Sequence, residues 1–152
     1  MGAIRGHIAR SGITAALVAL VPLGLAACSS DEDTTVDVAL QEFSVIPAQD
    51  SAPSGSVTFE VENTGPDDVH EFVVIKTDLA PEALPTDDTG AVNEEGDGIE
   101  VVDEIEDVPV GETQEVTAEL DAGKYVLICN IYDKEEQEAH YMLGMRTAFT
   151  VE

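Results

Sequence analysis

The chain has 152 residues, which suits one domain, and its 32 acidic and six basic side chains give a net charge of −26. Such an acidic surface repels nucleic acid and anionic lipid, so the composition argues against nucleic-acid binding and favours basic partners. The same charge also suits plain solubility or a salt-adapted surface, so charge alone does not establish a docking role.

The first 27 residues predict an export signal. Arg5 and Arg10 precede an apolar stretch, residues 12–25, that is short for a membrane-spanning helix. The stretch ends in Leu-Ala-Ala-Cys at residues 25–28, which resembles a bacterial lipobox and implies a lipid on Cys28. The alternative is an ordinary secretory signal cut after Ala27, which leaves Cys28 free. We expect residues 1–27 to be removed, residues 28–35 to form a flexible tether, and the protein to sit on the outer (periplasmic) face of the cytoplasmic membrane.

Residues 36–152 predict one domain of short strands. The strands are expected over residues 38–46, 56–62, 70–75, 99–105, 116–120, 124–129 and 146–151. Between the third and fourth of these lies a long acidic segment, residues 77–97, with one helical turn expected at residues 81–84. About seven to eight short strands with frequent turns and no long helix predict an all-β fold, an antiparallel Greek-key β-sandwich.

Cys129 is the only free thiol of the exported chain if Cys28 carries lipid, and His70 and His140 are its only histidines once His7 is removed. Cys129 ends a predicted strand with its side chain facing inward, and Met145 follows His140 in the next loop. Individually these are ordinary: a buried cysteine, a solvent-facing loop histidine, a partly exposed histidine at a strand end and a core methionine. Together, one thiolate, two imidazoles and one thioether suit copper that cycles between two oxidation states.

The spacing of these residues resembles that of the cupredoxin family, the type 1 copper proteins similar to plastocyanin and azurin. The resemblance lies in Gly123-Lys124-Tyr125, Cys129, His140, Gly144-Met145 and Thr150-Val151, and in Asn63-Thr64-Gly65 ahead of His70. It implies a cupredoxin-like fold with His70, Cys129, His140 and Met145 as ligands of one type 1 copper ion. It also implies that Asn63, Glu71 and Asn130 lie around the ligands.

An acidic insertion, residues 132–139, departs from the family pattern, and Ala139 replaces the glycine that often precedes the loop histidine. Because the cost of loop closure grows only slowly with length, we expect the metal site to survive. The apolar docking patch usual around this histidine is expected to be overlaid by carboxylates. Met142 is an alternative axial ligand, although Met145 keeps the family spacing.

With four protein ligands, the expected centre leaves no open position for a substrate, so we expect no enzyme activity. The favoured interpretation is a lipid-anchored, monomeric carrier of single electrons that meets a redox protein partner, which the acidic surface suggests is basic. A copper-binding or copper-delivery protein of the cell envelope, with the acidic loop as a gate, is the second interpretation. A metal-free β-sandwich interaction domain is the third.

Overall fold

The structure is a computed structural model that describes residue 2 and residues 34–152. The expected signal peptide, the lipidation of Cys28 and most of the expected tether lie outside these residues. Among the described residues, no helix has the length and apolar character needed to cross a membrane.

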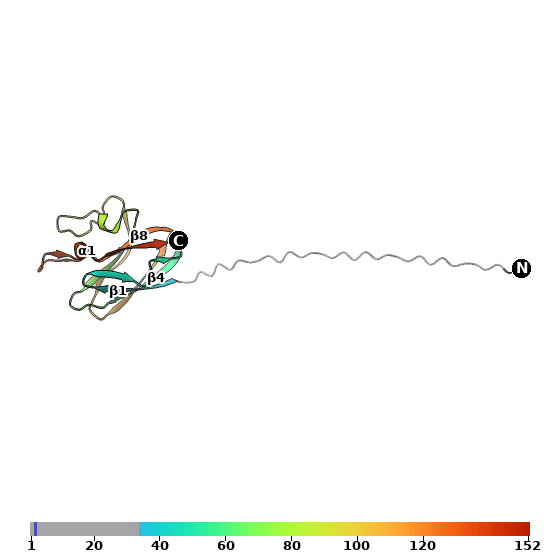
Figure 1. Ribbon diagram of the computed structural model, residues 1–152, viewed down its shortest axis with the longest axis horizontal. Helices are drawn as coiled ribbons and strands as arrows, with labels where there is room; N and C mark the ends of the chain where they lie inside the picture. The colour runs from blue at the N-terminus through green and yellow to red at the C-terminus, as the bar shows by residue number, and fades with distance from the viewer. Residues whose placement is uncertain (1, 3–33) are drawn as a thin grey trace.

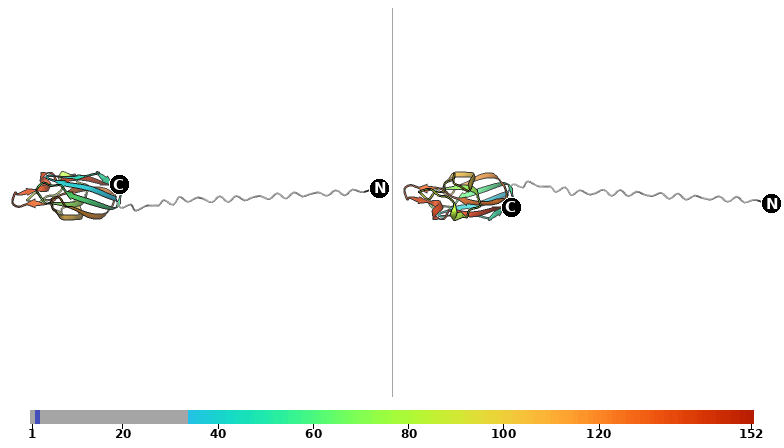
Figure 2. Two further views of the ribbon diagram at one scale, coloured as in Figure 1. Left: turned by 90° about the horizontal axis from the view of Figure 1, so that it is seen from below. Right: turned by 90° about the horizontal axis from the view of Figure 1, so that it is seen from above.

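Two β-sheets form the fold (Figures 1 and 2). The first has the order β2-β1-β4-β7, formed by β1 (Thr34–Gln41), β2 (Ser44–Pro47), β4 (Gly55–Asn63) and β7 (Thr113–Leu120). The second has the order β3-β11-β8-β5-β6, formed by β3 (Ser51–Ala52), β5 (His70–Thr77), β6 (Ile99–Val108), β8 (Gly123–Ile128) and β11 (Arg146–Val151). The expected all-β sandwich is confirmed. Most pairs are antiparallel, but β1 pairs with β4, and β11 with β3, in parallel.

The predicted first strand is in fact a hairpin. Strands β1 and β2 pair antiparallel, with Leu40 opposite Val45, and turn at Glu42 and Phe43. Leu40 and Val45 are both buried. Residues an odd number apart face opposite sides of a continuous strand, so a turn is required for both side chains to reach the same core.

The main core lies between the two sheets. Alternate residues of β4, Val57, Phe59 and Val61, are buried there, as their spacing predicts. The Phe59 ring packs against Phe72 and Phe149 of the second sheet, with centroid distances of 5.3 and 5.6 Å. Such tilted aromatic pairs contribute about 0.5–1.5 kcal/mol each beyond their buried area.

A second, smaller core covers the outer face of the β5–β8 sheet. Val73, Ile75, Val126 and Ile128 are buried on this face. Residues 78–98 cover them, chiefly through Leu84 and Val92; this segment contains the 3₁₀ turn η1 (Pro81–Ala83), where a helical turn was expected. Coverage on both faces explains why β5 and β8 are continuous apolar runs rather than alternating ones.

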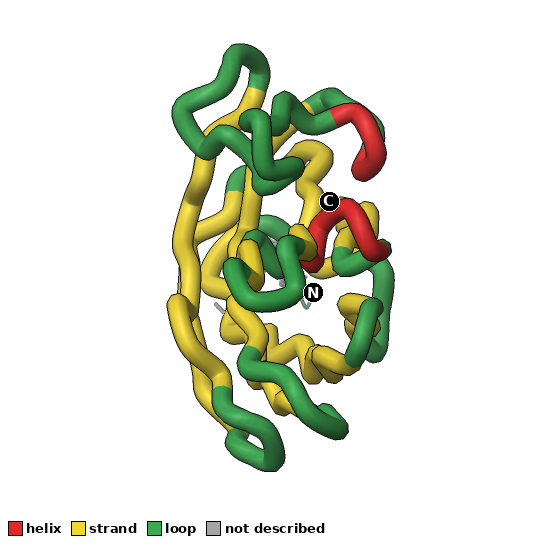
Figure 3. The backbone as a smooth tube through the Cα atoms, turned by 90° about the vertical axis from the view of Figure 1, so that its left-hand side faces the viewer, coloured by secondary structure: helices red, strands yellow, loops and turns green. Residues whose placement is uncertain are grey.

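The segment between β8 and β11 forms a projecting hairpin and one helical turn. Strands β9 (Tyr132–Asp133) and β10 (Glu138–Ala139) pair antiparallel, and α1 (His140–Leu143) follows directly. The hairpin extends from the end of the domain away from the C-terminus (Figure 1), and Figure 3 views the domain from that end. The insertion predicted as a loop is therefore a small ordered hairpin.

Candidate metal centre

Three of the expected ligands lie at one end of three neighbouring strands. His70 is the first residue of β5, Cys129 directly follows β8, and Met145 directly precedes β11. Because β5, β8 and β11 run antiparallel side by side, these three ends coincide at the edge of the main core. The backbone N–H of Cys129 donates to the carbonyl of Met145 at 3.1 Å, which continues the pairing of β8 and β11.

His140 reaches the same place from α1. Its backbone N–H donates to the carbonyl of Ile131 at 2.9 Å, and its own carbonyl accepts from the N–H of Met145 at 3.1 Å. The first bond closes the base of the β9–β10 hairpin, so the inserted residues protrude without displacing His140. This closure is the physical reason why the insertion leaves the ligand in place.

The ligand atoms of the two histidines and the cysteine converge. Cys129 Sγ lies 3.5 Å from His140 Nδ1 and 3.9 Å from His70 Nδ1, and the two Nδ1 atoms are 3.3 Å apart. A metal ion binds nitrogen and sulfur at about 2.0–2.3 Å, so its ligand atoms lie roughly 3–4 Å from one another. The three atoms therefore fit a single metal ion, and two imidazoles with a thiolate are the equatorial donor set of a type 1 copper site.

Met145 is the methionine placed to complete the set. Its side chain is fully buried in the main core beside Cys129. Met142 is 58% exposed and lies over Gly90. The burial and the backbone contacts of Met145 with both Cys129 and His140 favour it over Met142 as the thioether that would complete the donor set.

Burial keeps the ligands uncharged in the metal-free protein. Burial raises the pKa of the Cys129 thiol to about 12, although the backbone N–H of Glu71 donates to its sulfur at 3.3 Å. Burial also lowers the pKa values of His70 and His140. The imidazoles are therefore neutral and ready to bind, whereas metal binding must displace the thiol proton.

Of the three residues expected around the ligands, Glu71 and Asn130 directly follow His70 and Cys129 in the chain, and Asn63 ends β4. Asn63 braces the loop before His70: its amide donates to the carbonyls of Asp68 and Val108, both at 2.8 Å, and accepts from the N–H of Gly65 at 2.8 Å. Asn130 connects the end of β8 to the covering segment, since its side chain accepts from the N–H of Val92 at 2.6 Å. Glu71 Oε2 accepts from the N–H of Asn130 at 3.2 Å.

Two residues of the β1–β2 turn also reach the centre, and no motif in the sequence pointed to them. Glu42 Oε1 lies 3.7 Å from His70 Nε2, and the Phe43 ring meets the His140 ring edge-on at 5.1 Å between centroids. Burial raises the pKa of Glu42, but backbone hydrogen bonds, from Asp68 and Asp67 among others, outweigh it and hold the pKa below its ordinary value. Neither contact is visible in a pattern that predicts one straight strand.

Tyr141 anchors the helical turn on its other side. Its hydroxyl donates to the carbonyl of Pro81 at 2.6 Å and accepts from the N–H of Leu84 at 3.3 Å, while its ring is buried in the outer core. Consecutive residues of α1 thus face the two cores, His140 toward the ligands and Tyr141 toward residues 78–98. This arrangement fixes the orientation of the loop histidine.

A group of carboxylates lies next to the centre. Oxygen atoms of Glu71, Glu94 and Glu104 lie within 4.8 Å of one another. Burial, followed by the charges of Glu94 and Glu104, raises the pKa of Glu71 to about 7. Carboxyl groups therefore cluster on the side of the centre where β5 meets β6, and Glu71 among them holds its proton more strongly than an ordinary glutamate.

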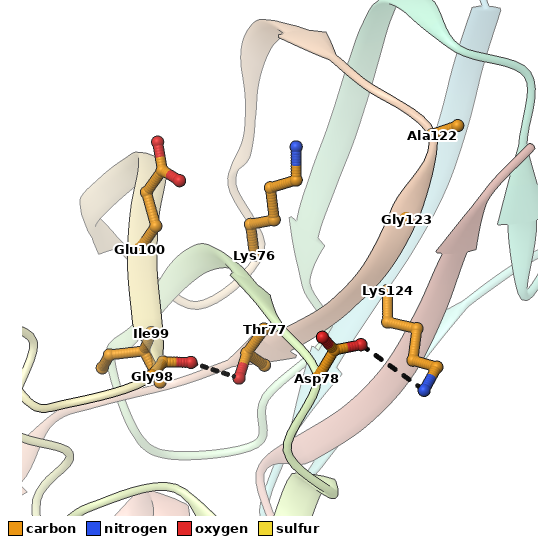
Figure 4. Close-up of a pocket in the computed structure, with 9 residues that line it drawn as sticks. All are labelled: Lys76, Thr77, Asp78, Gly98, Ile99, Glu100, Ala122, Gly123 and Lys124. Carbon is orange, nitrogen blue, oxygen red and sulfur yellow. Dashed lines mark hydrogen bonds and ion pairs between the residues drawn. The ribbon is translucent and has the colours of Figure 1, made fainter.

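The far end of the same sheet has a different character. A pocket there is lined by the end of β5, the start of β6 and the turn into β8 (Figure 4). Its two lysines are paired with aspartates, Lys76 with Asp121 at 3.3 Å and Lys124 with Asp78 at 3.5 Å. These pairs leave little net positive charge for an anion, and the pocket lies at the opposite strand ends from His70 and Cys129.

No protein-family model matches the chain, and no curated protein matches it by sequence. Solved structures do match. Auracyanin from Roseiflexus castenholzii is 21% identical over 79% of this chain and 98% of its own, with a TM-score of 0.56. Auracyanin A, a "blue" copper protein from Chloroflexus aurantiacus, is 20% identical over 79% of this chain and 99% of its own, with a TM-score of 0.53. Rusticyanin from Thiobacillus ferrooxidans is 18% identical over 78% of this chain and 76% of its own, with a TM-score of 0.51. These matches confirm the cupredoxin-like fold.

Proposed function

We propose that this chain is a type 1 copper protein that carries single electrons between redox partners and is not an enzyme. The observation that supports this most directly is the convergence of His70 Nδ1, His140 Nδ1 and the buried sulfur of Cys129, with Met145 beside them. Copper supplies a one-electron couple in such a donor set, because a weak thioether makes both oxidation states acceptable to one geometry.

The protein's own contribution is to hold these donors still and exclude water. His70, Cys129 and Met145 are fully buried, and His140 is 3% exposed. Their backbones begin β5, adjoin β8 and β11 through a backbone hydrogen bond between Cys129 and Met145, or lie in the hydrogen-bonded turn α1, so little rearrangement accompanies a change of charge. A centre with four protein ligands and no approach for substrate suits electron transfer better than catalysis.

The partner is proposed to be a redox protein with a basic docking face. The β9–β10 hairpin next to His140 carries Asp133, Glu135, Glu136 and Glu138, against one lysine. Met142 and Leu143, which follow His140, are 58% and 42% exposed and offer an apolar contact beside the acidic hairpin. Complementary charge of this kind accelerates encounter more than it strengthens binding.

Anchoring is proposed to occur through a lipid on Cys28, at the outer face of the cytoplasmic membrane. The proposal rests on the two arginines, the apolar stretch and the Leu-Ala-Ala-Cys sequence at residues 25–28. Mass spectrometry of the protein from membranes of its expression host would test it. A diacylglyceryl mass on Cys28 supports the anchor, whereas a free thiol or an uncut leader contradicts it.

The copper proposal is tested by adding one equivalent of Cu(II) to residues 29–152 and recording visible and electron paramagnetic resonance spectra. An intense blue or green charge-transfer band with narrow copper hyperfine splitting, together with reversible one-electron reduction, is expected. A pale complex with ordinary hyperfine splitting would indicate copper delivery instead. No binding would leave a metal-free interaction domain.

A further inference from the structure

The imidazole of His70 has one nitrogen for a metal and one that faces the protein. Its Nδ1 lies 3.9 Å from Cys129 Sγ and 3.3 Å from His140 Nδ1, so Nδ1 is the atom directed at the centre. Its Nε2 is buried and has no hydrogen-bond partner among the described residues. When a neutral histidine binds metal through Nδ1, the proton must lie on Nε2. A buried N–H at that position requires an acceptor.

Glu42 is the side chain that faces this nitrogen. Its Oε1 lies 3.7 Å from His70 Nε2, just beyond hydrogen-bond length, and its Oε2 is a second buried atom without a partner within residues 34–152. The carboxylate is held in place because Oε1 accepts from the backbone N–H groups of Asp67 and Asp68 at 3.0 and 2.7 Å. The imidazole Nε2 of His70 and the carboxylate Oε2 of Glu42 are thus buried atoms of two neighbouring side chains, and neither has a hydrogen-bond partner among residues 34–152.

Support of the loop alone does not account for this arrangement. The two backbone N–H groups use only Oε1, and they could be satisfied by a carboxylate facing solvent. Instead Oε2 is buried and unpaired in the described part of the chain, and the same carboxylate lies with Oε1 3.7 Å from the unpaired Nε2 of the imidazole; an unpaired buried oxygen and an unpaired buried N–H are both unfavourable. A hydrogen bond from the Nε2–H of His70 to this carboxylate would remove the cost of the unpaired N–H.

We propose that Glu42 is a positioning residue for the metal centre: its carboxylate accepts the Nε2–H of His70, and this selects the tautomer whose Nδ1 lone pair faces the metal. The carboxylate also makes the imidazole a stronger donor, which favours the oxidised metal. Partners of this kind change metal affinity by about 10–100-fold when they are removed. The effect on the metal rests on the proposed copper function, whereas the choice of tautomer does not.

The substitution Glu42→Gln tests the proposal sharply. The amide oxygen is needed by the N–H groups of Asp67 and Asp68, so the amide nitrogen, a donor, is turned toward His70 Nε2. A donor there requires Nε2 to accept. The His70 tautomer should therefore change from Nε2–H in the unaltered protein to Nδ1–H in the variant.

Long-range ¹H–¹⁵N correlation spectra of the metal-free, ¹⁵N-labelled protein report this tautomer directly. The expected result is Nε2–H for the unaltered chain and Nδ1–H, or a mixture, for Glu42→Gln. Glu42→Asp, which keeps the charge on a shorter side chain, should restore Nε2–H at least in part. Glu119→Gln, on β7 and exposed, is the matched control and should change nothing. Backbone amide spectra verify that each variant is folded.

Copper titration supplies the second readout. Glu42→Gln is expected to weaken Cu(II) binding about tenfold or more and to raise the reduction potential, while Glu119→Gln leaves both unchanged. An Nδ1–H tautomer in the unaltered protein, or an unchanged tautomer in Glu42→Gln, would overturn the role of Glu42. If no blue spectrum forms, the proposed copper function is wrong, yet the His70 tautomer still tests the positioning role of Glu42.

If Glu42→Gln does not fold, the positioning role of Glu42 is tested by the His70 tautomer in the unaltered protein and in Glu42→Asp.

Discussion

Cys129 is the residue expected to make metal binding most strongly dependent on pH. Its pKa of about 12 means that the metal-free thiol is protonated at neutral pH. Copper binding at pH 7 should therefore release about one proton per ion, and the apparent affinity should rise about tenfold per pH unit while the histidines stay neutral. A pH-stat titration with Cu(II) measures the release. No proton release would contradict a bound thiolate.

The serine variant is the control for this prediction. Cys129→Ser should release no such proton and should lose the thiolate-to-copper band. The fold should persist at a cost of about 1–2 kcal/mol, because a hydroxyl can accept the N–H of Glu71 as the sulfur does. If Cys129→Ser keeps the band, the cysteine is not the ligand.

Met145 is the residue expected to determine how strongly the oxidised metal is stabilised. Met145→Leu conserves volume in the core and should cost less than about 1.5 kcal/mol of stability. The colour should persist, because the thiolate is untouched, and the reduction potential should rise, because the axial donor is lost. Voltammetry measures the potential. Met142→Leu is the matched control at an exposed position, and a shift there instead would reassign the axial ligand.

At the scale of elements, α1 connects the metal centre to the segment that covers the sheet. Tyr141→Phe removes the hydroxyl that bonds the carbonyl of Pro81 and the N–H of Leu84. We expect a loss of about 1–3 kcal/mol and faster hydrogen exchange at the Leu84 amide, because both backbone groups lose a partner. The copper spectrum should change little, since Ile131 and Met145 hold His140.

Tyr132→Phe is the matched control for the Tyr141 prediction. Tyr132 lies in the β9–β10 hairpin, and its hydroxyl makes no hydrogen bond within residues 34–152. Its replacement should leave both the unfolding free energy and the Leu84 exchange rate unchanged. Equal effects of the two substitutions would show that the anchoring bonds contribute nothing.

The β9–β10 hairpin is the element expected to guide partners. Replacing Glu135, Glu136 and Glu138 with glutamine should slow electron transfer to a small cationic ruthenium complex several-fold at low salt, since steering by the local field is lost. Stopped-flow rates against ionic strength measure the effect. The control replaces three exposed carboxylates of the sandwich with glutamine: Glu60, Glu115 and Glu119. Equal slowing by both sets would assign steering to net charge alone.

At the scale of the whole molecule, self-repulsion among 32 acidic side chains opposes folding. Removing Arg5 and Arg10 with the leader would take the net charge from −26 to −28. Raising ionic strength from about 0.02 to 0.5 M should therefore stabilise the fold by about 1–2 kcal/mol, a rise in Tm of roughly 4–8 °C. Scanning calorimetry measures it. A Tm that stays level or falls with salt would show that repulsion is not limiting.

Much of the fold followed from local patterning. The alternation of Val57, Phe59 and Val61 predicted a half-buried strand, and the apolar run of β5 predicted a central one. The pattern predicted one strand through Glu42 and Phe43, but the chain turns there. Leu40 and Val45 are both buried in the same core, which requires a hairpin. Patterning also failed at residues 132–143, where a hairpin and a helical turn replaced a loop. Short elements have too few residues for periodicity to reveal them.

The sequence by itself determined the fold class and the donor types, because strand periodicity and the scarcity of cysteine and histidine are local facts. Only the tertiary structure decided that the two Nδ1 atoms and the sulfur converge, that Met145 rather than Met142 is buried beside them, and that Glu42 faces His70. These are contacts between residues far apart in the chain. Their distances depend on how strands pair and how the turns pack, which no local spacing encodes.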